Sequence, residues 1–337
     1  AGTVMTPDAA ATAVEEVGIR ASLGDPFVWD IEGSGGPALD RIPFTPRRAF
    51  DVMGTELKRN ADADALVRGH VCLRGMGSAS DELAIAAKKL ADKHGVVLNM
   101  HQSFDKPDVT RDDQRFGRHP LVHYSEIGLL GENCTFAHVN HIRDDEVGPI
   151  LESGTSVVWC PAASMLHGVG GTFNGRHAEL HRQGANVALG CDSANFTTAF
   201  DIADQALLAI LTAREKTGDA DALHAEDVLE MATVNGAQAV GQSDNLGSLE
   251  VGKRADLVIR REDLPEAHPG LDPVRSVVHS SRSKSVDTVI VNGEVIVERG
   301  HSTRVDEEEV YARSREAARR ILEEMDLSPP PPRWPHI

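Results

Sequence analysis

The sequence lacks the features that mark membrane-spanning, secreted and disulfide-bonded proteins. No apolar run approaches the roughly 20 residues that a membrane-spanning helix needs, and no signal peptide is evident. The 337 residues include only four cysteines, which lie far apart at positions 72, 134, 160 and 191. Isolated cysteines of this kind indicate small core residues in a reducing compartment. We therefore expect a cytoplasmic protein.

Basic residues are also scarce. The chain carries 34 lysines and arginines against 52 aspartates and glutamates, which gives a formal net charge of −18. Surfaces that bind nucleic acids or anionic membranes need clustered positive charge, so we expect neither kind of partner. The composition instead indicates an acidic surface around a core of the size that a chain of this length can bury.

What the sequence does contain is a repeated alternation of short apolar runs and helical spacing. Apolar runs at residues 134–138, 155–160 and 186–192 have the length and composition of buried parallel strands. Segments 144–153 and 176–184, which lie between these runs, have helical spacing. This alternation predicts an α/β fold built on a parallel sheet.

Polar residues follow these strands where a parallel sheet places its chemistry. His138 ends the first run and Asp192 the last, while His101 ends a further strand at residues 96–100. Because the C-terminal ends of parallel strands share one rim, we expect the three side chains to lie together. Imidazole and carboxylate groups suit zinc and neighbouring divalent ions, and a catalytic zinc lowers the pKa of its bound water to about 7.

The character of the sequence changes near residue 245. Residues 246–259 contain short strands and turns, and residues 286–297 have the pattern of a hairpin with Asn292-Gly293 at its turn. A charged amphipathic helix is predicted for residues 306–325, before a Pro-rich tail. We divide the chain into a barrel, a small β-unit and a helix with a tail, at residues 1–243, 244–300 and 301–337.

Further expectations concern the segments around the strands. The charged segment at residues 105–115 is predicted to be a loop, either solvated or covering a substrate. Residues 225–240 have the spacing of one long helix. The pairs His119/His123 and His177/His181 have helical spacing, and we expect them on exposed helices.

Five stretches of the sequence carry a family resemblance in order along the chain. They are Phe136-Ala-His-Val-Asn-His-Ile-Arg-Asp-Asp-Glu146, Gly154-Thr-Ser-Val-Val-Trp-Cys-Pro161, Gly184-Ala-Asn-Val-Ala-Leu-Gly-Cys-Asp-Ser193 and residues 232–240 and 247–258. They resemble the amidohydrolase superfamily, with the closest similarity to its branch of triazine hydrolases and cytosine and guanine deaminases. The resemblance covers about residues 65–300. It implies a (β/α)8 TIM barrel of the metal-dependent hydrolase type with a small β-sandwich.

The resemblance also implies roles for individual residues around one divalent metal ion. Zinc is the expected metal, with cobalt, manganese and iron as alternatives. His101 would be a metal ligand, and Asp192 both a ligand and the general base. His138 would lie at the metal and contact its bound water or the polarised oxygen of a small-molecule substrate. His141 would be a catalytic neighbour or a helix cap. The substrate pocket would include Phe104, Ser164, His167 and Asn195.

The sequence departs from the family pattern in its histidines. The family has a His-x-His pair on its first strand, whereas no two of the 15 histidines here lie two residues apart. The chain also opens without Met and leads almost at once into a helix. We expect the pair, and the first strands of the barrel, to lie in an N-terminal segment outside this chain. An N-terminal fragment of the same protein would then be a partner.

A second departure bears on the reaction. Deaminases of this branch carry a glutamate three residues after the fifth-strand histidine, where this chain has Phe104, and an aromatic ring cannot transfer a proton. Asp105 would replace the glutamate only if the strand end bulges. We therefore expect hydrolysis of an amide-, urea-, carbamate- or thiocarbamate-like bond, as in the phenylurea and molinate hydrolases. A nucleobase or triazine aminohydrolase and an inactive barrel subunit are the alternatives.

The C-terminal residues suggest an assembly. Trp334 and Ile337 are unusually apolar for a free chain end, which favours docking on a neighbouring subunit. We expect a homo-oligomer.

Overall fold

The computed structural model describes residues 7–25, 28–34, 44–194, 197 and 200–327. Two predictions lie outside the described residues: the pocket residue Asn195 and the apolar tail at residues 328–337. Within the described part of the chain, no helix combines the length and the apolar character needed to cross a membrane.

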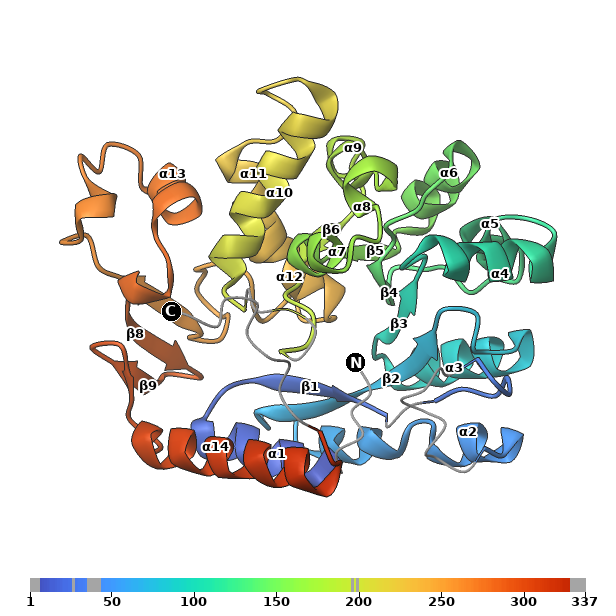
Figure 1. Cartoon of the computed structure of the whole chain (residues 1–337), viewed down its shortest axis with the longest axis horizontal. Coiled ribbons are helices and arrows are strands. Elements are labelled where there is room, and N and C mark those ends of the chain that lie inside the picture. The colour runs from blue at the N-terminus through green and yellow to red at the C-terminus, as the bar shows by residue number, and fades with distance from the viewer. Residues whose placement is uncertain (1–6, 26–27, 35–43, 195–196, 198–199, 328–337) are drawn as a thin grey trace.

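Six parallel strands form a curled sheet at the centre of the molecule (Figure 1). The strand order is β1-β2-β3-β4-β5-β6, so each strand lies beside its neighbours in sequence. This confirms the predicted α/β fold of the barrel type without its first strands. Among the described residues, β1 and β6 do not pair with each other, and the sheet is a half barrel. The strands span Ala21–Gly24 (β1), Val67–Gly75 (β2), Leu98–Gln102 (β3), Cys134–His138 (β4), Ser156–Trp159 (β5) and Val187–Leu189 (β6).

The strands form where short runs are apolar on both faces. Phe136, Val157 and Val187 are fully buried, as expected for strands that other layers cover on both sides. Helices line the outside of the curved sheet (Figure 1). They span Pro7–Val17 (α1), Pro46–Val52 (α2), Asp81–His94 (α3), Lys106–Phe116 (α4), Pro120–Glu126 (α5), Asp144–Ser153 (α6), Pro161–His167 (α7), Gly171–Asn174 (α8), His177–Arg182 (α9), Ile202–Thr217 (α10), Ala225–Ala232 (α11) and Val234–Ala239 (α12). The short helix Pro273–Arg275 (α13) packs on α11, on the side of the second sheet.

The charged segment after His101 is a helix, α4, and its prediction as a loop is wrong. Few apolar residues mark its inner face, so the periodic signal is weak. Its ends carry the signals that decide the structure. The Asp105 side chain accepts a hydrogen bond from the Asp108 N–H, and Gly117 ends the helix in the left-handed conformation. The predicted helix at residues 225–240 is also wrong in part, because the backbone leaves the helical region at Thr233, between α11 and α12.

A second, antiparallel sheet follows the half barrel, with the order β10-β9-β8-β7. The predicted hairpin joins β8 to β9, and positive φ angles of 52° at Asn292 and 84° at Gly293 confirm its type I′ turn. Arg20, just before β1, binds Asp256 through two hydrogen bonds of 2.7 and 3.0 Å. This pair ties the two sheets together. The strands span Leu257–Arg260 (β7), Val286–Val291 (β8), Glu294–Glu298 (β9) and His301–Ser302 (β10), with short 3-10 or π turns at Thr55–Ala61 (η1), Pro265–Ala267 (η2), Ser276–Ser280 (η3) and Ser283–Ser285 (η4).

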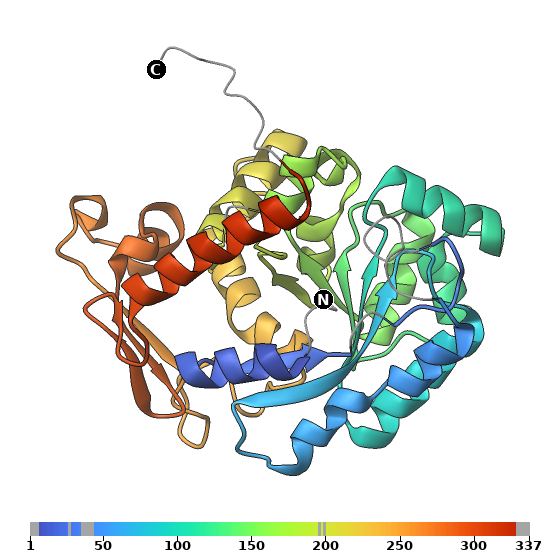
Figure 2. The same cartoon turned by 60° about the horizontal axis from the view of Figure 1, so that its bottom comes forward.

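The last described element is the long helix α14, Glu307–Glu324, as the amphipathic pattern predicts. Figure 2 shows it leading away from the small sheet. None of its residues is buried, and its apolar residues Val310, Tyr311 and Ile321 are about half exposed. The division of the chain at residues 243/244 and 300/301 stays a prediction.

Candidate active site

Three strand ends meet at one rim of the half barrel, where parallel strands deliver their C-terminal residues. β3 carries His101, β4 ends at His138, and Asp192 follows β6 by three residues. The rings of His101 and His138 are nearly parallel, with centroids 5.4 Å apart. His138 Nε2 lies 3.9 Å from Asp192 Oδ2. The structure thus brings together the three residues that the sequence singles out, although their roles stay predictions.

The backbone at this rim is strained. Positive φ angles occur at Ser103 (49°), His138 (77°), Val139 (49°) and Asp192 (63°), none of which is glycine. Each such residue costs roughly 1–3 kcal/mol and persists only where the surrounding structure enforces it. Their concentration at the ends of β3, β4 and β6 supports a functional site at this rim.

His101 has the environment of a metal-binding histidine. Its Nδ1 donates a hydrogen bond of 2.9 Å to the carbonyl oxygen of Arg74, which leaves the lone pair of Nε2 free. Such a carbonyl partner commonly fixes the tautomer of metal-ligating histidines. Burial lowers the pKa of His101, which favours the neutral ring. Gly75 on β2 lies close to the main chain of His101 on β3. A Cβ at Gly75 would lie 1.9 Å from the carbonyl oxygen of His101, so only a glycine allows the two strands to approach this closely.

His138 is buried between polar and aromatic neighbours. Its Nδ1 has no hydrogen-bond partner among the described residues. Burial, and then the neighbouring His101 and His177, hold the pKa of His138 well below its ordinary value. A neutral imidazole here can offer one N–H and one lone pair to a bound group.

Phe104 packs against this imidazole. Its ring meets that of His138 edge to face, with centroids 4.7 Å apart, so the site has an aromatic wall where the resemblance leads one to expect a carboxyl group. Asp105 does not fill that place. Its Oδ1 accepts a hydrogen bond of 2.7 Å from the Asp108 N–H as the N-cap of α4.

The donor set of this rim fits a zinc ion in kind, with two imidazoles and one carboxylate. It does not form a closed site by itself. In the part of the chain that the structure describes, no group of three or more His, Cys, Asp or Glu residues is arranged to hold a metal ion. The roles of His101, His138 and Asp192 as metal ligands stay a prediction, because the described residues form no complete donor set.

The other predicted site residues lie in less direct positions. His141 Nε2 donates a hydrogen bond of 2.8 Å to the Val169 carbonyl. Ser164 is buried, and its hydroxyl accepts a hydrogen bond of 3.1 Å from the Gly171 N–H. His167 ends α7 and is exposed. These contacts hold loops together, and the catalytic and pocket roles of the three residues stay predictions.

The exposed placement predicted for two histidines is wrong, because His119 and His177 are buried. His119 Nδ1 lies 2.8 Å from Glu146 Oε1. His177 stacks on Trp159, with ring centroids 4.6 Å apart and planes inclined by 2°. Its Nε2 donates a hydrogen bond of 2.7 Å to the His138 carbonyl. Its burial follows from the contact with Trp159 of β5, which no spacing along α9 indicates.

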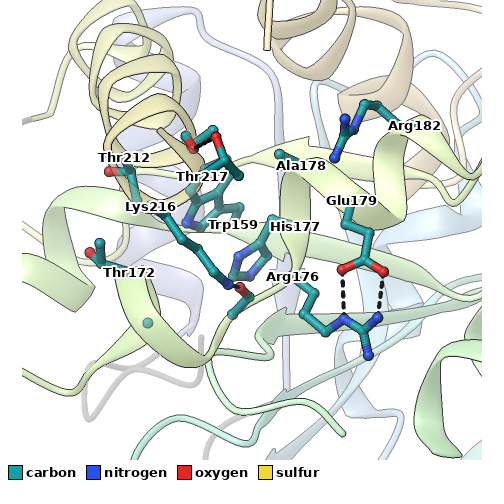
Figure 3. Close-up of a pocket in the computed structure, with 13 residues that line it drawn as sticks. Trp159, Thr172, Arg176, His177, Ala178, Glu179, Arg182, Thr212, Lys216 and Thr217 are labelled. Atoms are coloured by element: carbon teal, nitrogen blue, oxygen red, sulfur yellow. Dashed lines mark hydrogen bonds and ion pairs between the residues drawn. The ribbon is translucent and has the colours of Figure 1, made fainter. Parts of the chain in front are cut away.

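Cavities lie around this rim and away from it. One of ≈ 80 Å³, shown in Figure 3, is lined by Trp159, His177 and Lys216. A groove of ≈ 990 Å³ includes His141, and a cavity of ≈ 430 Å³ at the other end of the strands includes Arg68. Among the described residues that line these three spaces, none is His101, His138 or Asp192.

Comparisons with known proteins agree with this architecture. The sequence model of the amidohydrolase family matches residues 8–296. A 5-methylthioadenosine/S-adenosylhomocysteine deaminase of Symbiobacterium thermophilum is 30% identical over 321 residues, which are 94% of this chain and 70% of the relative. A zinc-bound adenosine deaminase of Xanthomonas campestris superposes with a TM-score of 0.85 at 24% identity, over 95% of this chain and 70% of that one. The zinc complex of the atrazine chlorohydrolase TrzN from Arthrobacter aurescens gives 0.80 at 23%, over 92% and 68%.

Proposed function

This chain belongs to the amidohydrolase family, and from that premise we propose that it hydrolyses an amide-, urea-, carbamate- or thiocarbamate-like bond of a small neutral molecule. Family membership makes it a hydrolase of carbon–nitrogen bonds. The observation that carries the finer proposal is the ring of Phe104, 4.7 Å from that of His138. The phenyl ring of Phe104 has no proton to transfer to a ring nitrogen of a substrate. A site with this aromatic wall can accept the alkyl or aryl substituent of an acyl substrate.

We propose that one divalent ion, with zinc as the first choice, is held by His101 and Asp192 and approached by His138. Two solved structures of this fold contain zinc, which supports the choice. When bound, the ion would supply Lewis acidity and a water of lowered pKa. The hydrogen bond between His101 Nδ1 and the Arg74 carbonyl supports this proposal.

The proposed work of the protein groups is proton transfer and charge stabilisation. Asp192 Oδ1 accepts a hydrogen bond from the Ser193 N–H, so Oδ2, which faces His138, takes the proton of the attacking water. It then returns this proton to the leaving nitrogen or sulfur. A ring N–H of neutral His138 would donate to the oxyanion as it forms. Phe104 would exclude water from the substituent side.

A second candidate function is an aminohydrolase that releases ammonia from a nucleobase or triazine. The deaminase names of the relatives favour it. This reaction needs an acid that protonates the ring nitrogen of the substrate. Phe104 has no proton to give, and Asp105 caps α4. The two candidates differ in the leaving group and in the need for a second acid.

A substrate panel separates these candidates. Zinc-supplemented protein is offered adenosine, 5′-methylthioadenosine, cytosine, guanine and chlorotriazines beside N-substituted ureas, carbamates and thiocarbamates, with Asp192→Asn as the inactive control. We expect turnover only in the second group. Ammonia release from the first group, without activity on the second, would establish the aminohydrolase instead.

We also propose partners for the two open edges of the sheet. β1 and β6 each pair with one neighbour among the described residues, and free edges of a parallel sheet are sites for further pairing. An N-terminal fragment that carries the His-x-His pair would fit there and complete the donor set. Co-purification of such a fragment from cells that express the whole gene tests this proposal.

A further inference from the structure

We propose that His177 is a positioning residue that holds the backbone of His138 in the conformation needed at the active site. The proposal rests on the proposed function, in which His138 approaches the metal ion and acts on the substrate oxygen. His177 begins α9 and follows His138 by 39 positions in the sequence. It touches the main chain of His138, so its action on the reaction would be indirect.

Hydrogen bonds hold the strained backbone at the end of β4 on two sides. On one side, the Val139 N–H donates to the Gln102 carbonyl at 2.9 Å and the Asn140 N–H to the Ser103 carbonyl at 3.0 Å. On the other, the His138 carbonyl accepts the hydrogen bond of 2.7 Å from His177 Nε2. With φ of 77°, His138 lies outside the strand region, and the His177 ring is a side-chain partner of its carbonyl.

The chemistry of His177 suits a fixed donor. The acceptor is a carbonyl oxygen, so the ring proton must lie on Nε2. With the proton on Nε2, the neutral ring carries its lone pair on Nδ1.

The ring itself is held on two sides. Trp159, at the end of β5, stacks on it in parallel. On a second side lies Gly175, where a Cβ would come within 2.7 Å of Cε1 and 2.8 Å of Nδ1 of the ring. Lys216 donates a hydrogen bond to the Gly175 carbonyl, and Figure 3 shows its side chain beside His177. A glycine is therefore needed for His177 to reach His138.

Substitutions can separate the hydrogen bond from the packing. His177→Phe keeps an aromatic ring on Trp159 and removes the donor. His177→Gln keeps a side-chain N–H near the position of Nε2 and removes the stack. His181→Gln changes a histidine of the same helix, which lies 3.5 Å from Asp227, and serves as the matched control.

The experiment measures two properties of each purified, full-length variant. The first is hydrogen–deuterium exchange of the Val139 and Asn140 amides. The second is the affinity for Zn²⁺ alone, by competition with a chelator. For His177→Phe we expect exchange about fivefold faster, as for the loss of one buried hydrogen bond. We expect its zinc affinity to fall by about 10–100-fold, as for other groups that orient ligands. His177→Gln and His181→Gln should stay close to wild type in both.

The outcomes separate this proposal from the proposed function. Wild-type exchange and affinity in His177→Phe, or equal losses in Phe and Gln variants, would overturn the positioning role. If wild-type protein binds no zinc, the metal proposal fails, while the exchange comparison still decides the role of His177. Should His177→Phe not fold, His177→Asn, whose amide is too short to reach, replaces it, and wild-type exchange in that variant overturns the proposal.

Discussion

At the scale of single residues, the close approach of β2 to His101 depends on one glycine. Gly75 has φ 74°, and a Cβ there would lie 1.9 Å from the His101 carbonyl oxygen. Gly95 has a similar φ of 59° with open space around the added atom. We predict that Gly95→Ala costs about 1–2 kcal/mol of unfolding free energy, the strain of the left-handed conformation. Gly75→Ala should cost at least about 2 kcal/mol more, because the backbone must move.

Urea unfolding of both variants beside wild type measures this difference. Equal losses for the two alanine variants would show that β2 and β3 yield without strain and that Gly75 does not fix the position of His101.

A buried carboxyl group predicts a pH dependence of stability. Burial, and then the charge of Asp112, raise the pKa of Asp108 to about 7 from its ordinary value of 3.8. The folded state therefore holds this proton more tightly than the unfolded state. The contribution to stability is complete below pH 3.8 and is lost as pH rises towards 7.

Asp108→Asn should remove this dependence, because an amide does not titrate. Its side-chain oxygen can still accept the hydrogen bond that the Phe104 N–H donates to Asp108. We expect the variant to be more stable than wild type at pH 8 and to lose that advantage at pH 4. Denaturant titrations at both pH values measure it, with the exposed Asp145→Asn as control. The same difference in unfolding free energy between Asp108→Asn and wild type at both pH values would contradict the raised pKa.

At the scale of elements, substitutions of Asp105 test whether its carboxyl group serves only as the cap of α4 or also takes part in the reaction. It is the N-cap of α4 and lies beside Phe104. Asp105→Asn preserves the cap, so we predict stability within about 0.5 kcal/mol of wild type and turnover within about twofold. Asp105→Ala should lose about 1 kcal/mol of stability.

Unfolding titrations and steady-state rates on the best substrate of the panel decide between the two roles. A stable Asp105→Asn protein with turnover reduced by 10²-fold or more, the usual loss of a general acid, would identify Asp105 as the proton donor.

Sequence predicted those elements whose signals are local and strong. The apolar runs at residues 134–138 and 155–160 gave β4 and β5 almost to the residue. Helix α4 escaped because its surface is nearly all polar, so only its caps distinguished it from a loop. The burial of His177 escaped because it follows from Trp159 on another strand, and no spacing along α9 alone records that contact.

At the scale of the whole molecule, the surface of α14 predicts an assembly. Its apolar residues are about half exposed, and burying such a stripe is the usual source of stability for an isolated helix. We predict a homo-oligomer whose subunits contact each other through the stripe of Val310, Tyr311 and Ile321. The substitution Ile321→Glu should dissociate it. Arg319→Gln, on the other face, should leave it unchanged. Light scattering that finds monomers for wild type would rule this out.

Metal stoichiometry tests the central claim most directly, which is that His101 and Asp192 hold a catalytic ion at the rim. Elemental analysis of the whole protein, expressed with zinc, is compared with Asp192→Ala, His101→Ala and the distant His301→Ala. We predict about one zinc per chain in wild type and His301→Ala, as for a single catalytic site, and strong loss in the other two variants. Equal zinc content in all four proteins, or none in wild type, would contradict the account.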